Sequence, residues 1–116
     1  MHTIRALLVR YSKDGLAAAY RYESAFRQVL WLNLILIVLT FILNFDSATK
    51  MLLIIASFVS LITELFNTAV EAAVDHTSTE KHELAKRAKD AGSAAQLLAL
   101  TMLGIVWAIA LWRGYV

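Results

Sequence analysis

Four polar side chains recur along one face of an otherwise apolar segment. They are spaced three, four and four residues apart, at Glu64, Asn67, Glu71 and Asp75. In a helix of about 100° per residue these positions fall within an arc of roughly 80°. An acid at the centre of a membrane helix costs on the order of 2.5–3.5 kcal/mol. Three aligned acids therefore predict a site that binds a metal ion or accepts a proton.

A structural interpretation competes with this one. Polar side chains also form hydrogen bonds between membrane helices and hold a bundle together. A single acid would fit either interpretation equally well. The three acids and the amide on one face favour a binding site.

A second polar set lies at the start of the last apolar stretch of the chain, at Lys86, Lys89, Asp90 and Ser93. Lys86, Asp90 and Ser93 share one helix face at i, i+4 and i+7. A cation suits a phosphate group, and an acid suits a metal ion or a cationic partner, so both sets resemble the groups used in Mg²⁺-dependent phosphoryl transfer. A plain ion pair of Lys89 with Asp90 or Asp75 is the alternative.

Other chemistries find little support in the sequence. No phosphate-binding glycine loop and no dinucleotide fingerprint is present. His2, His76 and His82 have no metal-ligand spacing and are expected at the surface. The chain has no Cys, which excludes disulfides and thiolate metal ligands.

The composition predicts an all-α integral membrane protein. Of the 116 residues 59% are apolar and 17% are charged. The apolar share is well above that of an ordinary globular domain, and the charged share is below it. Three stretches are long enough to cross a bilayer, at residues 29–45, 51–72 and 91–112. We expect one membrane-embedded domain over residues 1–116. Three spans cannot shield the acidic row from lipid, so an oligomer is expected.

Lys and Arg predict the orientation. Nine of them precede the first span or lie between the second and third, and only Lys50 and Arg113 fall on the other side. By the positive-inside rule the N-terminus and the second loop face the cytoplasm. The acidic row then runs from within the membrane to the cytoplasmic surface, where soluble substrates reach it.

The segment before the first span is amphipathic. Its apolar residues follow helical spacing over residues 1–27, which predicts a surface helix lying in the headgroup region. Gly15 is expected to divide it into two shorter helices. Anchoring does not explain Glu23, an acid beside the membrane. Asp46-Ser47 is a predicted helix start, and the second span is expected to continue as a helix to about Asp75.

Three motifs carry a resemblance to a known family. They read Glu23-Ser-Ala-Phe-Arg27-Gln28, Glu64-Leu-Phe-Asn67-Thr-Ala-Val-Glu71-Ala-Ala-Val-Asp75 and Ala88-Lys89-Asp90-Ala-Gly92-Ser93-Ala-Ala. Together they resemble the prokaryotic diacylglycerol kinases, small homotrimeric enzymes of the bacterial inner membrane. The resemblance implies a lipid kinase that converts diacylglycerol and MgATP to phosphatidic acid and ADP.

The resemblance also implies a role for individual residues. Glu64 would be the general base that receives the proton of the lipid hydroxyl, and Asn67 would shape that site. Glu23 and Glu71 would bind the Mg²⁺ that bridges the ATP phosphates. The remaining implied contacts are with the nucleotide or the lipid: Tyr11, Asp75, Glu80, Lys89 and Asp90 for ATP, and Ser93 with Glu64 for the lipid.

The chain departs from the best-known members of this family in its N-terminal segment. Ile4 occupies a position where an Arg is usual, and Asp14 stands where a basic residue is usual. Two other functions remain open. One is undecaprenol kinase, a sister activity on the same scaffold, and the other is a small oligomeric transporter whose acids line a path. The transporter requires polar groups through the whole bilayer, whereas here they gather at the cytoplasmic end.

Overall fold

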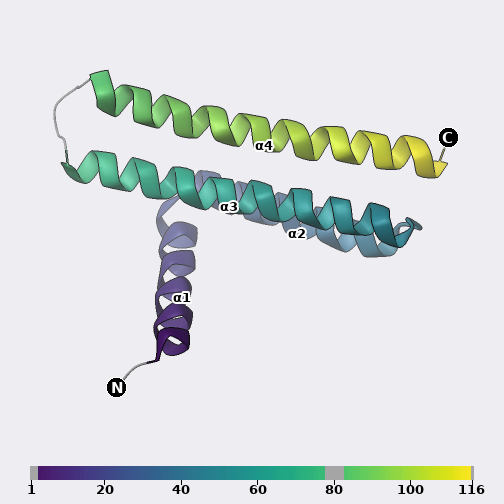
Figure 1. Cartoon of the computed structure of the whole chain (residues 1–116), viewed down its shortest axis with the longest axis horizontal. Coiled ribbons are helices and arrows are strands. Elements are labelled where there is room, and N and C mark those ends of the chain that lie inside the picture. Colours follow the sequence, from purple (N-terminus) through teal and green to yellow (C-terminus); the bar gives the residue numbers. More distant parts are fainter. Residues whose placement is uncertain (1–2, 78–82, 116) are drawn as a thin grey trace.

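The computed structural model describes residues 3–77 and 83–115. Helices account for nearly all of them, and no strand occurs in these two ranges. In chain order they are α1 (Ile4–Tyr22), α2 (Ser24–Ile42), α3 (Ser47–Thr77) and α4 (Glu83–Tyr115), shown in Figure 1. The last three are long and apolar enough to cross a membrane. The predicted all-α fold with three membrane-spanning helices is confirmed.

α1 stands apart from the long helices and meets them at a tight corner. Figure 1 shows α1 directed away from the roughly parallel α2, α3 and α4. Thr3 starts it by accepting a hydrogen bond from the backbone N–H of Ala6 at 3.2 Å. At its end the Arg27 guanidinium donates to the carbonyls of Tyr20 at 2.7 Å and Arg21 at 3.3 Å. Because these carbonyls lack a partner within the helix, Arg27 fixes the angle between α1 and α2.

α3 packs between α2 and α4 and joins the bundle together. At one end Phe45, Leu53 and Ala110 form a buried apolar cluster, and the Phe45 ring meets the Trp107 ring edge-on with 5.9 Å between centroids. Within the membrane segment the Asn33 amide of α2 donates to the Ser60 hydroxyl of α3 at 2.8 Å. Such bonds between membrane helices contribute on average about 0.6 kcal/mol each.

The observed helices differ from the predicted spans in several places. α2 ends at Ile42, so Phe45 belongs to the turn and packs into the apolar cluster. α3 starts at Ser47 as predicted and continues beyond Asp75 to Thr77. α4 is one continuous helix from Glu83, so the charged residues before position 91 extend the third span into water.

The predicted break at Gly15 is wrong. α1 runs uninterrupted from Ile4 to Tyr22. A glycine within a helix costs only about 1 kcal/mol relative to alanine, and Leu16 with the three alanines after it are good helix formers. The structure ends this helix instead at Glu23, whose backbone is extended.

Candidate functional site

The polar row of α3 runs from a buried end to an exposed end. Glu64 is only 4% exposed, Asn67 and Glu71 are half-buried, and Asp75 is exposed. All four lie on α3, whose helical repeat puts them on one face as predicted. The row therefore offers one acid sheltered from water and another accessible to soluble molecules.

Carboxylates from two parts of the chain gather around Glu64. Its carboxyl group lies within electrostatic range of Glu71, two turns farther along α3, and of Glu23. Glu23 occupies the corner between α1 and α2, where it precedes α2 as the N-cap residue but makes no capping hydrogen bond with its side chain. Ser, Thr, Asp and Asn are the residues preferred there. An acid that serves neither the helix start nor the anchor, yet lies within electrostatic range of the buried Glu64, indicates a functional group.

Asn67 fits between α3 and α4 through an unusually close approach. Its Nδ2 donates to Glu71 Oε1 at 3.5 Å. On the other side it lies against Gly92 of α4, where an added Cβ would overlap Asn67 Oδ1 and come within 3.3 Å of Asn67 Cγ. Small residues allow membrane helices to approach closely. In the single chain Gly92 is where that approach occurs, and Ala91, Ala94 and Ala95 are exposed.

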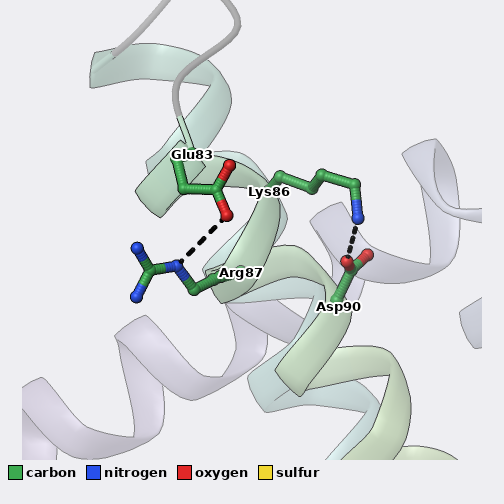
Figure 2. A network of polar contacts seen from close by, with 4 residues as sticks. All are labelled: Glu83, Lys86, Arg87 and Asp90. Atoms are coloured by element: carbon green, nitrogen blue, oxygen red, sulfur yellow. Dashed lines mark hydrogen bonds and ion pairs between the residues drawn. The ribbon is translucent and has the colours of Figure 1, made fainter.

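Ion pairs surround the exposed end of the row. Lys89 of α4 pairs with Asp75 of α3, with Nζ and Oδ1 2.5 Å apart, so it bridges the two helices. Asp90 instead pairs along its own helix with Lys86, at 2.7 Å. Figure 2 shows this pair beside the Glu83–Arg87 pair at the start of α4. Lys89 is thus the cation that faces the acidic row, and Asp90 lies on the exposed side of α4.

The remaining predicted residues lie farther from this centre or outside the described ranges. Tyr11 is exposed on α1, which is directed away from the long helices (Figure 1). Ser93 is exposed on α4. Glu80 lies outside the residues that the structure describes. Within one chain, the structure brings together Glu64, Asn67, Glu71, Glu23 and the Asp75–Lys89 pair.

The donor set fits a metal ion that is bound together with a substrate. The described residues contain no group of three or more His, Cys, Asp or Glu side chains arranged to hold a metal by themselves. Mg²⁺ usually uses one or two carboxylates and completes its shell with water and substrate phosphates. Glu23 and Glu71, both within electrostatic range of Glu64, suit such a shared site.

Sequence reasoning missed a buried amide beside Glu64. Gln96 of α4 is 7% exposed, and its side chain interacts with the Glu64 carboxyl. Neither Gln96 Oε1 nor Nε2 completes a hydrogen bond of standard geometry. The signal was present, because an amide within the predicted span 91–112 is as unusual as Asn33 in the first span. Gln96 lies outside the motifs that carry the resemblance and outside both predicted polar sets.

Comparison with known proteins assigns the chain to one family. The family profile of prokaryotic diacylglycerol kinase matches residues 10–111. A diacylglycerol kinase of Pseudomonas aeruginosa is 48% identical over 98 residues, covering 84% of this chain and 80% of the relative. One from Helicobacter pylori is 50% identical over 97 residues, covering 84% and 76%, and one from Escherichia coli K12 is 45% identical over 105 residues, covering 90% and 86%. The chain belongs to the prokaryotic diacylglycerol kinase family.

Proposed function

We propose that this protein transfers the γ-phosphoryl group of ATP to the free hydroxyl of diacylglycerol, giving phosphatidic acid and ADP. The observation that carries the proposal is the sheltered Glu64 carboxyl, set in a helix long and apolar enough to span a membrane and within electrostatic range of two further carboxylates. A lipid hydroxyl reaches such a group from within the bilayer. The names of the relatives support the choice of diacylglycerol as the acceptor.

Glu64 acts as the general base. It receives the proton of the lipid hydroxyl while the hydroxyl oxygen attacks the γ-phosphorus and the bond to the β–γ bridging oxygen breaks. A base of this kind contributes typically 10²–10⁴-fold to the rate. Its near-complete burial keeps bulk water from competing as the acceptor of the phosphoryl group. Asn67 limits the space beside Glu71 and orients that carboxylate through its amide.

Glu71 and Glu23 would hold Mg²⁺ together with the ATP phosphates. The metal ion supplies neutralisation of the charge that the transferring group carries. Lys89 supplies a cation next to the acidic row for the phosphates, and Asp75 keeps its side chain aligned. Asp90 and Ser93 lie within the next turn of α4, where they contribute contacts to the nucleotide and the lipid headgroup.

The same reasoning covers location and assembly. Nine Lys and Arg residues lie before the first span or between the second and third, and two lie on the opposite side of the membrane. By the positive-inside rule the N-terminus and the nucleotide end of the row therefore face the cytoplasm, at a bacterial inner membrane. The exposed alanines beside Gly92 are suited to close contact with a second helix. A homotrimer, as the family resemblance implies, would cover this face and enclose the acidic row.

A direct assay tests the proposal. Purified protein in mixed micelles is supplied with MgATP and either diacylglycerol or undecaprenol, with Glu64→Gln as the control. We expect phosphatidic acid from the wild type, with turnover lower by 10²–10⁴-fold in Glu64→Gln and an unchanged unfolding temperature. Phosphorylation of undecaprenol alone would show that undecaprenol, and not diacylglycerol, is the acceptor. Absence of phosphoryl transfer to either lipid would refute a lipid kinase.

A further inference from the structure

One buried side chain close to Glu64 has no role in the fold. Gln96 lies on α4 with 7% of its surface exposed, and both of its polar atoms are buried without a standard hydrogen bond. A buried amide without partners costs free energy, so most such groups in native proteins are paired. An apolar side chain of similar size would pack there without this cost. The stability of the fold therefore does not explain why position 96 carries an amide.

The neighbour of Gln96 explains its presence. Gln96 follows Gly92 by four residues on α4, and Glu64 precedes Asn67 by three residues on α3. Because α3 and α4 run in opposite directions (Figure 1), the contact of Gly92 with Asn67 places Gln96 opposite the Glu64 carboxyl, which is itself 4% exposed. The charged groups around Glu64 are Glu71 on the same helix and Glu23 at the α1–α2 corner, and both repel a second negative charge. Among these neighbours Gln96 alone offers N–H groups. Hydrogen bonds at catalytic groups are often long in the absence of substrate and tighten when the reaction complex forms.

A second buried amide shows the contrasting case. Asn33 of α2 is fully buried, and its Nδ2 donates to the Ser60 hydroxyl at 2.8 Å and to the Val29 carbonyl at 2.9 Å. Ser60 precedes Glu64 by one helical turn on the same helix. Asn33 therefore ties α2 to α3 below the site, as a structural amide does, whereas the Gln96 amide makes no such bond.

We propose that Gln96 is a positioning residue for Glu64. The side-chain N–H of Gln96 holds the Glu64 carboxyl group in the orientation that receives the proton of the lipid hydroxyl. The proposal rests on the role of Glu64 in the proposed function. It adds an α4 residue at the buried end of the row, where the site is otherwise built from α3 and the α1–α2 corner. Gln96 itself contacts neither ATP nor the lipid.

Steady-state kinetics of Gln96→Met test the proposal. Met has a similar volume and no N–H, so we expect kcat to fall by about 10- to 100-fold, the loss of one hydrogen bond to a charged group. The KM values for diacylglycerol and MgATP should stay within about twofold. The unfolding temperature should stay equal or rise, because an unpaired buried amide is replaced by an apolar group. An unchanged kcat, or a higher KM at unchanged kcat, would overturn the proposal.

A double-mutant cycle asks whether Gln96 acts through Glu64. In the Glu64→Gln background, Gln96→Met should have little further effect on the residual turnover, since the group that it positions is gone. Independent, multiplying effects would overturn the proposal. Asn33→Leu is the matched control, because it removes a buried amide with two hydrogen bonds: it should lower the unfolding temperature and leave the kcat of the folded enzyme within about twofold.

A spectroscopic measurement separates this inference from the proposed function. Infrared difference spectra between the wild type and Glu64→Gln identify the carboxyl band of Glu64 without any turnover. A change in the polar groups next to a carboxyl group shifts its carbonyl stretch, so Gln96→Met, which removes the amide dipole, should move that band and Asn33→Leu should not. An unmoved band with an active wild type overturns the role of Gln96 alone. An inactive wild type with a shifted band refutes the kinase and retains the contact.

Discussion

The contact between α3 and α4 at Gly92 gives the sharpest test of the site geometry. In Gly92→Ala, the new methyl group would overlap Asn67 Oδ1 and press on Asn67 Cγ at 3.3 Å, whereas the Asn67 Cα at 3.9 Å is at ordinary distance. The overlap concerns the end of a flexible side chain and not the backbone. Asn67 must therefore rotate away, and the hydrogen bond to Glu71 Oε1 is lost.

Two opposing contributions set the size of the effect. Alanine in place of glycine in a helix interior stabilises by roughly 0.5–1 kcal/mol. Overpacking at a tight contact destabilises by typically 1–3 kcal/mol, and a rotation of Asn67 away from its rotamer minimum by 30° adds about 0.5–1.5 kcal/mol. Gly104 lies on the same helix with nothing within 4 Å of its added Cβ, so Gly104→Ala experiences the favourable contribution alone. Comparison of the two variants isolates the steric cost.

The assay combines thermal unfolding in detergent micelles with lipid kinase turnover. We expect Gly92→Ala to be less stable than Gly104→Ala by about 1–3 kcal/mol and to lose most of its turnover. The double variant Gly92→Ala/Asn67→Ala removes the overlapping atoms, so stability should recover while turnover stays low. Equal stability and turnover in Gly92→Ala and Gly104→Ala would refute the close approach, and recovery of turnover in the double variant would exclude Asn67 from the site.

Three further perturbations have defined outcomes. Glu71→Ala should raise the Mg²⁺ concentration that half-saturates turnover, because a ligand is lost; an unchanged titration contradicts its role. Lys89→Met should raise the KM for ATP more than the KM for diacylglycerol, because a cation for the phosphates is lost. The fold should persist, since the exposed pair with Asp75 contributes only about 0–1 kcal/mol to stability. Equal effects on both KM values, and the same effects in Asp75→Asn, would indicate a structural ion pair. The hydrogen bond from the Thr49 hydroxyl holds the pKa of the Asp46 carboxyl below its usual value of 3.8. The unfolded chain therefore binds that proton more readily, so this stabilisation is present above about pH 4 and is lost on acidification through the folded-state pKa. The unfolding temperatures of the wild type and Thr49→Val should accordingly differ near neutral pH and converge in acid; a constant difference contradicts this.

The sequence predicted the helices and the polar row because each rests on a periodic pattern. Three long apolar stretches define three membrane helices, and spacing alone places Glu64, Asn67 and Glu71 on one face. The predictions failed where a local preference competes with its neighbours. Gly15 weakens a helix by about 1 kcal/mol, which the flanking leucine and alanines offset.

Contacts between helices lay beyond what the spacing predicts. The sequence left Asp75 and Asp90 as possible ion-pair partners of Lys89. The pair with Asp75 forms because of the way α4 packs against α3. Gln96 beside Glu64 and Asn33 beside Ser60 depend in the same way on the rotation of one helix relative to another. A linear pattern fixes the face of a helix and leaves open which side chain of a neighbouring helix meets it.

The burial gradient along α3 has a consequence for how the two substrates meet. Glu64 is sheltered within a membrane-spanning helix, and Asp75 is exposed about 16 Å farther along the axis, at 1.5 Å per residue. A lipid hydroxyl approaches from the Glu64 end, and a soluble nucleotide approaches from the Asp75–Lys89 end. Glu71 lies between them and is half-buried. On the proposed function, the γ-phosphoryl group is therefore transferred between Glu64 and Glu71, where the Glu23 carboxylate joins them, and adenosine remains in water.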